Sequence, residues 1–124
     1  MIAIDSSTLI AFIQGEPGAD VEAFDRALAS GDVLLPPVVI TEVLSDPGLP
    51  AGHRRLIGSL PVMDLPTGHW ERAAETRQTV VAKKLRARLA DTLIAQACID
   101  HDVPLITRDK DFRHFARHCG LKLA

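Results

Sequence analysis

Four carboxylates stand in unusually apolar stretches of this chain. Asp5 follows the run Ile2–Ile4, Glu42 lies in VVITEVL, Asp91 lies in LADTLIAQACI, and Asp109 follows PLIT. A carboxylate among apolar residues is costly to bury unless it is paired or bound to a metal. Carboxylates without nearby cysteine or histidine favour a hard cation, Mg²⁺ or Mn²⁺. Because such ions bind phosphate oxygens and lower the pKa of a bound water, the pattern predicts chemistry on a phosphate substrate.

Each of these four acids also has a simpler interpretation. Asp5 and Asp109 could cap helices. Asp91 could favour the dipole of a helix N-terminus, and Glu42 could lie on a solvated face, although the residues around it are apolar. Four caps would have no reason to lie beside apolar strand ends, and Glu42 caps no helix. We therefore interpret the four acids together as a metal site.

Short apolar runs alternate with longer helical patterns along the chain. Strands are expected at Ile2–Ile4, Val33–Leu35, Val62–Leu65, Leu105–Thr107 and Leu121–Leu123. Helices are expected at Ser7–Gln14, Pro17–Ser30, Val38–Leu44, Ala51–Leu60, Thr67–Ala82 with Thr67 as its cap, Leu89–His101 and Lys110–His118. This alternation, with continuously apolar strands, indicates a parallel sheet covered on both faces. Ligands bind beyond the carboxyl ends of such strands, so Asp5 and Asp109 are expected at one edge.

The composition is that of an ordinary globular protein. The 124 residues are 47% hydrophobic and 24% charged, which predicts one domain, residues 1–124. The net charge of −2 gives no overall attraction for nucleic acid or a membrane, so a polyanion must be held locally. No apolar run approaches the ~20 residues that span a bilayer, and no basic region precedes the first apolar residues. We expect a cytoplasmic protein in which Cys98 and Cys119 are free thiols.

Three further features allow more than one interpretation. The densest basic run, KKLRAR, is either a solvated helix end and loop or a phosphate contact, through Lys83, Lys84, Arg86 and Arg88. The pair His114 and His118 has a spacing that zinc sites use, but no third ligand is evident, so a solvated face is expected. Trp70 is expected to pack its helix on the core, with an exposed position on a dimer or partner surface as the alternative.

The segments AIDSSTLI, VVITEVL, LADTLIAQA and PLITRDKDF occur in the order and approximate spacing of the PIN-domain ribonucleases. Over essentially its whole length the chain most resembles the VapC-type toxins of bacterial type II toxin–antitoxin pairs. The resemblance implies a three-layer α/β/α sandwich on a short parallel sheet. It also implies an endoribonuclease that cleaves RNA with Mg²⁺ or Mn²⁺, forms a homodimer and is silenced by a cognate antitoxin protein.

The same resemblance implies roles for individual residues. The catalytic acids would be Asp5, Glu42, Asp91 and Asp109. Asp111 resembles a more variable fifth acidic position, so the metal ligands would be Asp5, Asp91, Asp109 and Asp111. Ser7 and Thr107 match small polar positions that orient the carboxylates or a metal-bound water. Neither the RNA target nor the number of metal ions follows from the sequence.

Three other functions remain open from the sequence. A housekeeping PIN-domain nuclease in RNA processing would carry the same motifs. A phosphatase of the haloacid-dehalogenase type would use Asp5 as nucleophile, but that family usually has a second aspartate where this chain has Ser7, and no suitable later lysine is evident. A non-catalytic RNA-binding domain would gain nothing from collecting carboxylates, which repel phosphate.

Overall fold

The computed structural model describes all 124 residues, and its sheet places the first strand of the sequence at the centre. The strands are β1 (Ile2–Ile4), β2 (Val33–Leu34) and β3 (Leu105–Ile106), parallel in the order β2-β1-β3. The helices are α1 (Ser6–Ile13), α2 (Ala19–Ala29), α3 (Pro37–Leu44), α4 (Ala51–Ser59), α5 (His69–Ala82), α6 (Leu89–His101) and α7 (Phe112–Cys119).

The pairing of β1 with β3 determines which residues meet at the edge of the sheet. Ile4 lies opposite Ile106, and the backbone N–H of Asp5 donates to the carbonyl of Ile106 at 3.1 Å. The two strands therefore end side by side, with Asp5 following one and Thr107 following the other. This pairing places the first and last acidic motifs at one edge of the sheet, as the sequence predicted.

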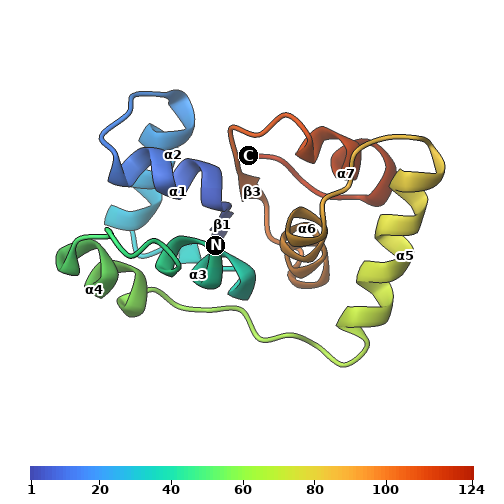
Figure 1. Cartoon of the computed structure of the whole chain (residues 1–124), viewed down its shortest axis with the longest axis horizontal. Helices are drawn as coiled ribbons and strands as arrows, with labels where there is room; N and C mark the ends of the chain where they lie inside the picture. Colours follow the sequence, from blue (N-terminus) through green and yellow to red (C-terminus); the bar gives the residue numbers. More distant parts are fainter.

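Helices cover both sides of the sheet (Figure 1). Helices α1, α2 and α4 lie on one side, and α5, α6 and α7 lie on the other. Helix α3 contacts both α1 and α6, so it joins the two sides below the strands. The predicted three-layer α/β/α sandwich on a short parallel sheet is confirmed.

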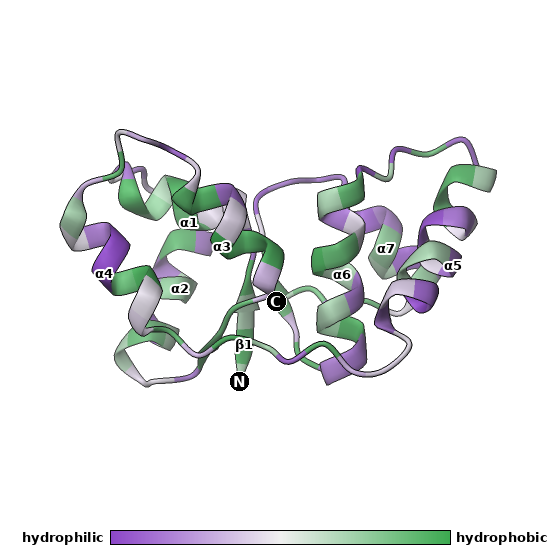
Figure 2. Cartoon of the chain, turned by 60° about the horizontal axis from the view of Figure 1, so that its bottom comes forward, coloured by the Kyte–Doolittle hydropathy of each residue, from purple (hydrophilic) through white to green (hydrophobic).

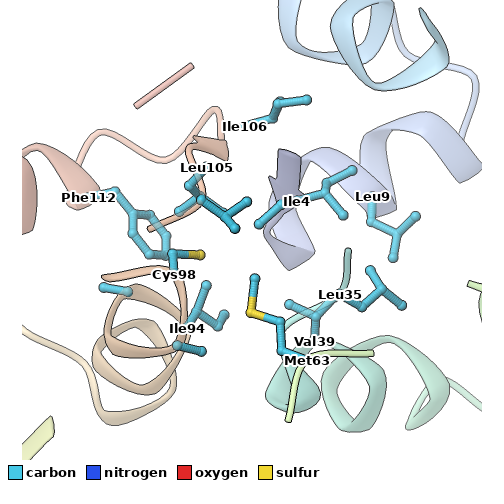
Figure 3. Packing of buried hydrophobic residues seen from close by; sticks show 14 of the residues in the cluster. Ile4, Leu9, Leu35, Val39, Met63, Ile94, Cys98, Leu105, Ile106 and Phe112 are labelled. Atoms are coloured by element: carbon cyan, nitrogen blue, oxygen red, sulfur yellow. The ribbon is translucent and has the colours of Figure 1, made fainter. Parts of the chain in front are cut away.

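The core gathers side chains from the strands and from α1, α3 and α6 (Figure 3). Ile4, Leu9, Val39 and Ile94 are all almost completely buried there. Helix α6 is green over most of its length in Figure 2, which shows that most of its residues are hydrophobic. This apolar character suits a helix against which α3, α5 and α7 all pack. Helices that carry a candidate acid are thus fixed on the core by their apolar faces, which holds the acids in place.

A buried aspartate joins α5 to α6. Asp100 accepts hydrogen bonds from Arg72 Nε at 2.9 Å, Arg72 Nη2 at 2.8 Å and Gln96 Nε2 at 2.9 Å. The Arg72 guanidinium is the main reason that the pKa of Asp100 is lowered to about 2. This contact fixes the outer helix α5, from which the basic run KKLRAR continues.

Two predicted strands are reduced to single bridges. Val62 pairs only with Leu35, and Leu123 pairs only with Leu105. The first ladder cannot extend because Leu35 is followed by Pro36 and Pro37, which have no N–H to donate and lead into α3. The predictions of strands at Val62–Leu65 and Leu121–Leu123 are therefore wrong.

Two predictions for the start of α5 also fail. The helix begins at His69 rather than Thr67, and Gly68 precedes it in the left-handed region with φ of 85°. Gly68 occupies the N-cap position, so no side chain caps this helix. Thr67 contacts the helix only through its carbonyl, which accepts from Arg72 Nη1 at 2.9 Å. His69 is the buried residue at this turn, whereas Trp70 is 60% exposed and does not pack on the core.

The two cysteines are free thiols, as the sequence predicted. Cys98 and Cys119 are free, and burial raises the pKa of the Cys98 thiol to about 12. None of the seven helices combines the length and the apolar character that crossing a membrane requires.

Candidate active site

Asp5 is held at the end of β1 by hydrogen bonds from three residues. The Thr8 N–H donates to it at 3.1 Å, the Ser7 hydroxyl at 2.8 Å and the Thr107 hydroxyl at 2.7 Å. Asp5 is therefore the N-cap of α1, as its simpler interpretation proposed. It is only 3% exposed, and this burial raises its pKa despite the three donors, with a smaller contribution from the charge of Asp109.

The Thr107 hydroxyl connects two of the acidic segments. Its O–H donates to Asp5, and its oxygen accepts from the backbone N–H of Asp109 at 3.0 Å. Asp109 in turn accepts from the N–H of Asp111 at 2.9 Å through Oδ1, a local turn that leads into α7. A single threonine thus sets the position of the β3–α7 loop relative to the β1 carboxylate.

Asp91 lies in the first turn of α6 and is the most perturbed acid of the group. Its Oδ2 atom is buried and has no hydrogen-bond partner. Burial, followed by the charges of Asp109, Glu42 and Asp5, raises its pKa to about 6, while Arg88 opposes this increase. The fold therefore brings the four predicted catalytic acids near enough for three of them to act on the fourth.

Glu42 is more exposed than its apolar neighbours suggested. Val39 and Val43 face the core from α3, whereas Glu42 lies on the solvent side of the helix. Its Oε1 accepts from the Ser6 hydroxyl at 2.6 Å. The expectation of a largely buried surface here is wrong, because the apolar residues occupy the other side of the helix.

Ser6 is a site residue that the sequence did not single out. Its hydroxyl joins the start of α1 to Glu42 of α3, as the Ser7 hydroxyl joins α1 to Asp5. The run of three hydroxyls after Asp5 was the available signal. It did not show which hydroxyl would reach an acid 36 residues away.

The structure places the fifth predicted acid and the basic run at the margin of this group. Asp111 Oδ2 lies 3.9 Å from Arg86 Nη1, so this acid faces a cation. Arg88 is near enough to Asp91 to lower its pKa. Lys83 and Lys84 follow the end of α5, and both are exposed.

Arg108 forms a second feature that the sequence did not reveal. Its Nε and Nη2 atoms donate to Asp20 at 2.8 and 3.0 Å, and its Nη1 donates to Glu16 at 2.9 Å. The guanidinium is the main reason that the pKa of Asp20 is lowered to about 2. We call Arg108, Asp20 and Glu16 the arginine clamp. It joins the β3–α7 loop to the α1–α2 region, across 88 residues of sequence between Asp20 and Arg108.

The arginine clamp also reaches the hydrogen bonds around Asp5. Asp20 accepts from the Thr8 hydroxyl at 2.9 Å, and the N–H of the same Thr8 donates to Asp5. Gly18 is required beside the clamp, because a Cβ there would lie 2.9 Å from Arg108 Nη2 and closer still to Asp20. The loop that carries Asp109 is thus fixed by Thr107 on one side and by Arg108 on the other.

The donor set fits a divalent metal ion, although the acids do not form a closed cage. No three of the chain's Asp, Glu, His or Cys side chains converge closely enough to hold an ion by themselves. The unpartnered Oδ2 of Asp91, surrounded by other carboxylates, nevertheless needs a cation or a proton. Oxygen donors of this kind suit Mg²⁺ or Mn²⁺.

A model of the PIN domain family matches residues 2–118. The chain belongs to the PIN domain family. The resemblance of the four acidic segments to PIN domains is confirmed, and the match favours a PIN domain over the haloacid-dehalogenase alternative.

Solved structures share this PIN fold over nearly the whole chain. A chain of VapBC2 from Rickettsia felis, bound to a DNA fragment from its promoter, has a TM-score of 0.77 at 18% identity, over 100% of this PIN domain and 98% of that chain. A chain of FitAcB from Neisseria gonorrhoeae has a TM-score of 0.69 at 20% identity, and the match covers 99% of this PIN domain and 96% of that chain. A chain of FitAB bound to an IR36 DNA fragment has a TM-score of 0.70 at 21% identity, and the match covers 100% of this PIN domain and 94% of that chain. No curated protein matches the chain.

Proposed function

We propose that this PIN domain is a divalent-metal-dependent endoribonuclease and the toxin of a toxin–antitoxin pair. The observation that carries the proposal is the buried, unpartnered Oδ2 of Asp91 among the charges of Asp5, Glu42 and Asp109. A structural aspartate would be expected to have donors, as Asp100 does. An acid without donors beside three other acids is suited to a cation that is itself bound by phosphate.

The proposal gives each acid a part in hydrolysis. Asp5, Asp91 and Asp109 would hold Mg²⁺ or Mn²⁺, and Asp111 would join them after release from Arg86. An ion held there would act as a Lewis acid toward the phosphate oxygens and would lower the pKa of a bound water. Glu42 is exposed, so its carboxylate is available to accept a proton from the attacking water.

The hydroxyl groups around Asp5 orient it and favour its ionised form, although burial raises its pKa overall. The Ser7 hydroxyl lies within hydrogen-bond distance of both of its oxygens, and Thr107 donates to Oδ2, which leaves the remaining lone pairs for an ion. Ser6 holds Glu42 in the same way through a single hydrogen bond. We propose that these three hydroxyls orient the acids and take no part in proton transfer.

The partner part of the proposal rests on the solved complexes. The VapBC2 and FitAB structures are named as complexes bound to DNA fragments, and this chain shares their fold. We propose a cognate antitoxin protein and a homodimer for this chain. If the chain is a toxin, expression of the wild type should arrest growth, and the product of a neighbouring gene should relieve the arrest. A housekeeping nuclease would need no such relief.

Incubation with total RNA tests the enzymatic proposal directly. The purified protein is expected to create new RNA ends with Mn²⁺ or Mg²⁺ and none with EDTA, because the ion is needed for phosphate activation. Mapping the 5′ ends of the products would reveal the target. The Asp5→Asn variant is the inactive control. Cleavage that persists in EDTA, or in Asp5→Asn, would contradict the proposal.

Metal binding can be measured without RNA. Mn²⁺ is expected to raise the melting temperature of the wild type by about 4 °C at a concentration tenfold above its dissociation constant, by mass action. Binding should be weak because no three acids converge in the metal-free structure. Asp5→Asn should respond much less, whereas Asp25→Asn, which removes an exposed acid from α2, should respond like the wild type. Equal shifts in all three proteins would place the ion elsewhere.

A further inference from the structure

One face of α7 and the turn before it carry only basic side chains. At 3.6 residues per turn, these side chains cover an arc of about 140°: Lys110, Arg113, His114, Arg117 and His118. The opposite face packs on the core through Phe112 and Phe115, which are fully buried. We call the five cations and potential cations the α7 basic face.

The α7 basic face has no carboxylate partners within the protein. Four other cations of the chain form ion pairs: Arg72 with Asp100, Arg86 with Asp111, Arg108 with Asp20 and Glu16, and Lys122 with Asp102. None of the residues of the α7 basic face lies within 4 Å of a carboxylate oxygen. Arg113 and Arg117 are exposed, so their guanidinium groups are available to an anion from outside.

The segment 83–88 lies beside this face. At one end, Lys83 is near His118, whose pKa is lowered by desolvation and then by the charges of Lys83, Arg117 and His114. At the other end, Arg86 lies 3.9 Å from Asp111, where α7 begins. Figure 1 shows the chain between α5 and α6 passing over α7. The basic residues of segment 83–88 therefore lie alongside those of the α7 basic face.

The α7 basic face begins beside Asp109, one of the four predicted catalytic acids. A cavity of about 210 Å³ is lined by Asp109 together with Lys110 and Arg113. The acid therefore shares one hollow with two unpaired cations. A phosphodiester strand with one phosphate beside Asp109 would have a neighbouring phosphate close to Lys110 and Arg113.

We propose that the α7 basic face, with segment 83–88, binds the sugar–phosphate backbone of the RNA strand that flanks the scissile bond. The inference rests on the proposed function for the identity of the nucleic acid. The chain is acidic overall, so attraction of RNA must come from a local group of unpaired cations. Contacts of this kind position a strand without reading its sequence.

Salt-dependent binding tests this surface with cleavage disabled. The protein would carry Asp91→Asn, and the test variant would add Arg113→Gln and Arg117→Gln. The probe is a short fluorescent single-stranded RNA of mixed sequence, measured at several NaCl concentrations. Two lost phosphate contacts should reduce the slope of log affinity against log salt by about 1.4, which corresponds to roughly 25-fold weaker binding at 0.1 M salt.

A matched control removes the same charge elsewhere. Arg26→Gln with Arg55→Gln takes two exposed, unpaired arginines from α2 and α4, on the other side of the sheet. Its slope should stay at the value of the parent protein. Arg113→Lys with Arg117→Lys should keep most of the slope, because the positive charges remain.

The outcomes separate this inference from the proposed function. An unchanged slope in the glutamine variant, or an equal loss in the α2–α4 control, would overturn the α7 surface. If the wild type cleaves total RNA while the slope is unchanged, only this inference fails. If the slope falls as expected but no divalent ion supports cleavage, the binding surface stands and the proposed nuclease activity fails.

Discussion

Replacing Asp91 with asparagine is expected to abolish RNA cleavage and, at the same time, to make the metal-free protein more stable. Loss of a ligand from a metal that activates phosphate should reduce the rate by about a thousandfold or more. The stability gain has a separate cause, because neutral asparagine relieves the burial of a charge beside Asp109, Glu42 and Asp5. Few structural substitutions would combine these two effects.

The gain in stability should depend on pH with a defined sign. Burial and the neighbouring acids raise the pKa of Asp91 from 3.8 to about 6, so the folded protein binds a proton more tightly than the unfolded chain does. The cost of the charge is therefore fully present above pH 6 and is lost progressively as the pH falls from about 6 to about 4. At pH 7.5 we expect a gain of about 1 kcal/mol, because Asp91 is partly exposed and water screens much of the repulsion.

Thermal unfolding in EDTA at pH 7.5 and pH 4.5, with a cleavage assay in Mn²⁺, measures both effects. The melting temperature of Asp91→Asn should exceed that of the wild type by about 4 °C at pH 7.5 and by much less at pH 4.5. Asp25→Asn removes a charge from the exposed side of α2 and should change neither property. Wild-type cleavage by Asp91→Asn would remove Asp91 from the site, and lower stability would show that its carboxylate has a structural partner.

Replacing Arg108 with leucine is expected to lower kcat about 10- to 100-fold while KM changes little. Its guanidinium nitrogens are already engaged by Asp20, Glu16 and the carbonyl of Pro17, which leaves little capacity for phosphate. The effect would instead come from movement of the loop that carries Asp109, since displacements near 1 Å are enough for losses of this size. Arg108 is thus a positioning residue.

A double-mutant cycle distinguishes positioning from a general loss of structure. Asp20→Asn and Arg108→Leu should each lower kcat, and the double variant should be little worse than either, because both remove one interaction. Arg108→Lys should restore only part of the rate, since lysine cannot form the two parallel hydrogen bonds to Asp20. A rise in KM with unchanged kcat would show that Arg108 binds RNA directly.

The elements that the sequence predicted well have strong local signals. Helix α6 begins and ends as predicted, at Leu89 and His101, because its apolar residues are continuous and it follows a basic loop. The strand β1 is also as predicted, since three apolar residues end at a polar run. The strands at Val62 and Leu123 were overestimated, because an apolar run does not show whether a partner strand continues beside it.

The sequence predicted the positions of the acids that follow strands. It predicted less well how exposed the site residues are and which residues they contact. Neighbouring parallel strands bring Asp5 and the Thr107–Asp109 loop together, which their position after apolar runs indicates. The exposure of Glu42 depends on the side of α3 that faces the core. The arginine clamp depends on residues 88 apart, and neither Asp20 nor Arg108 has a local pattern that marks the other as its partner.

The hydrogen bond from Thr107 to Asp5 spans 102 residues of sequence, and this has a consequence for the timing of synthesis. A ribosome adds about 5 to 20 residues per second, so β1 is synthesised roughly 5 to 20 s before its neighbour β3. Until then the central strand lacks one edge partner, and the acidic group lacks Asp109. A nascent chain, or one that terminates before β3, would therefore be harmless to the RNA around it, including the message from which it is translated.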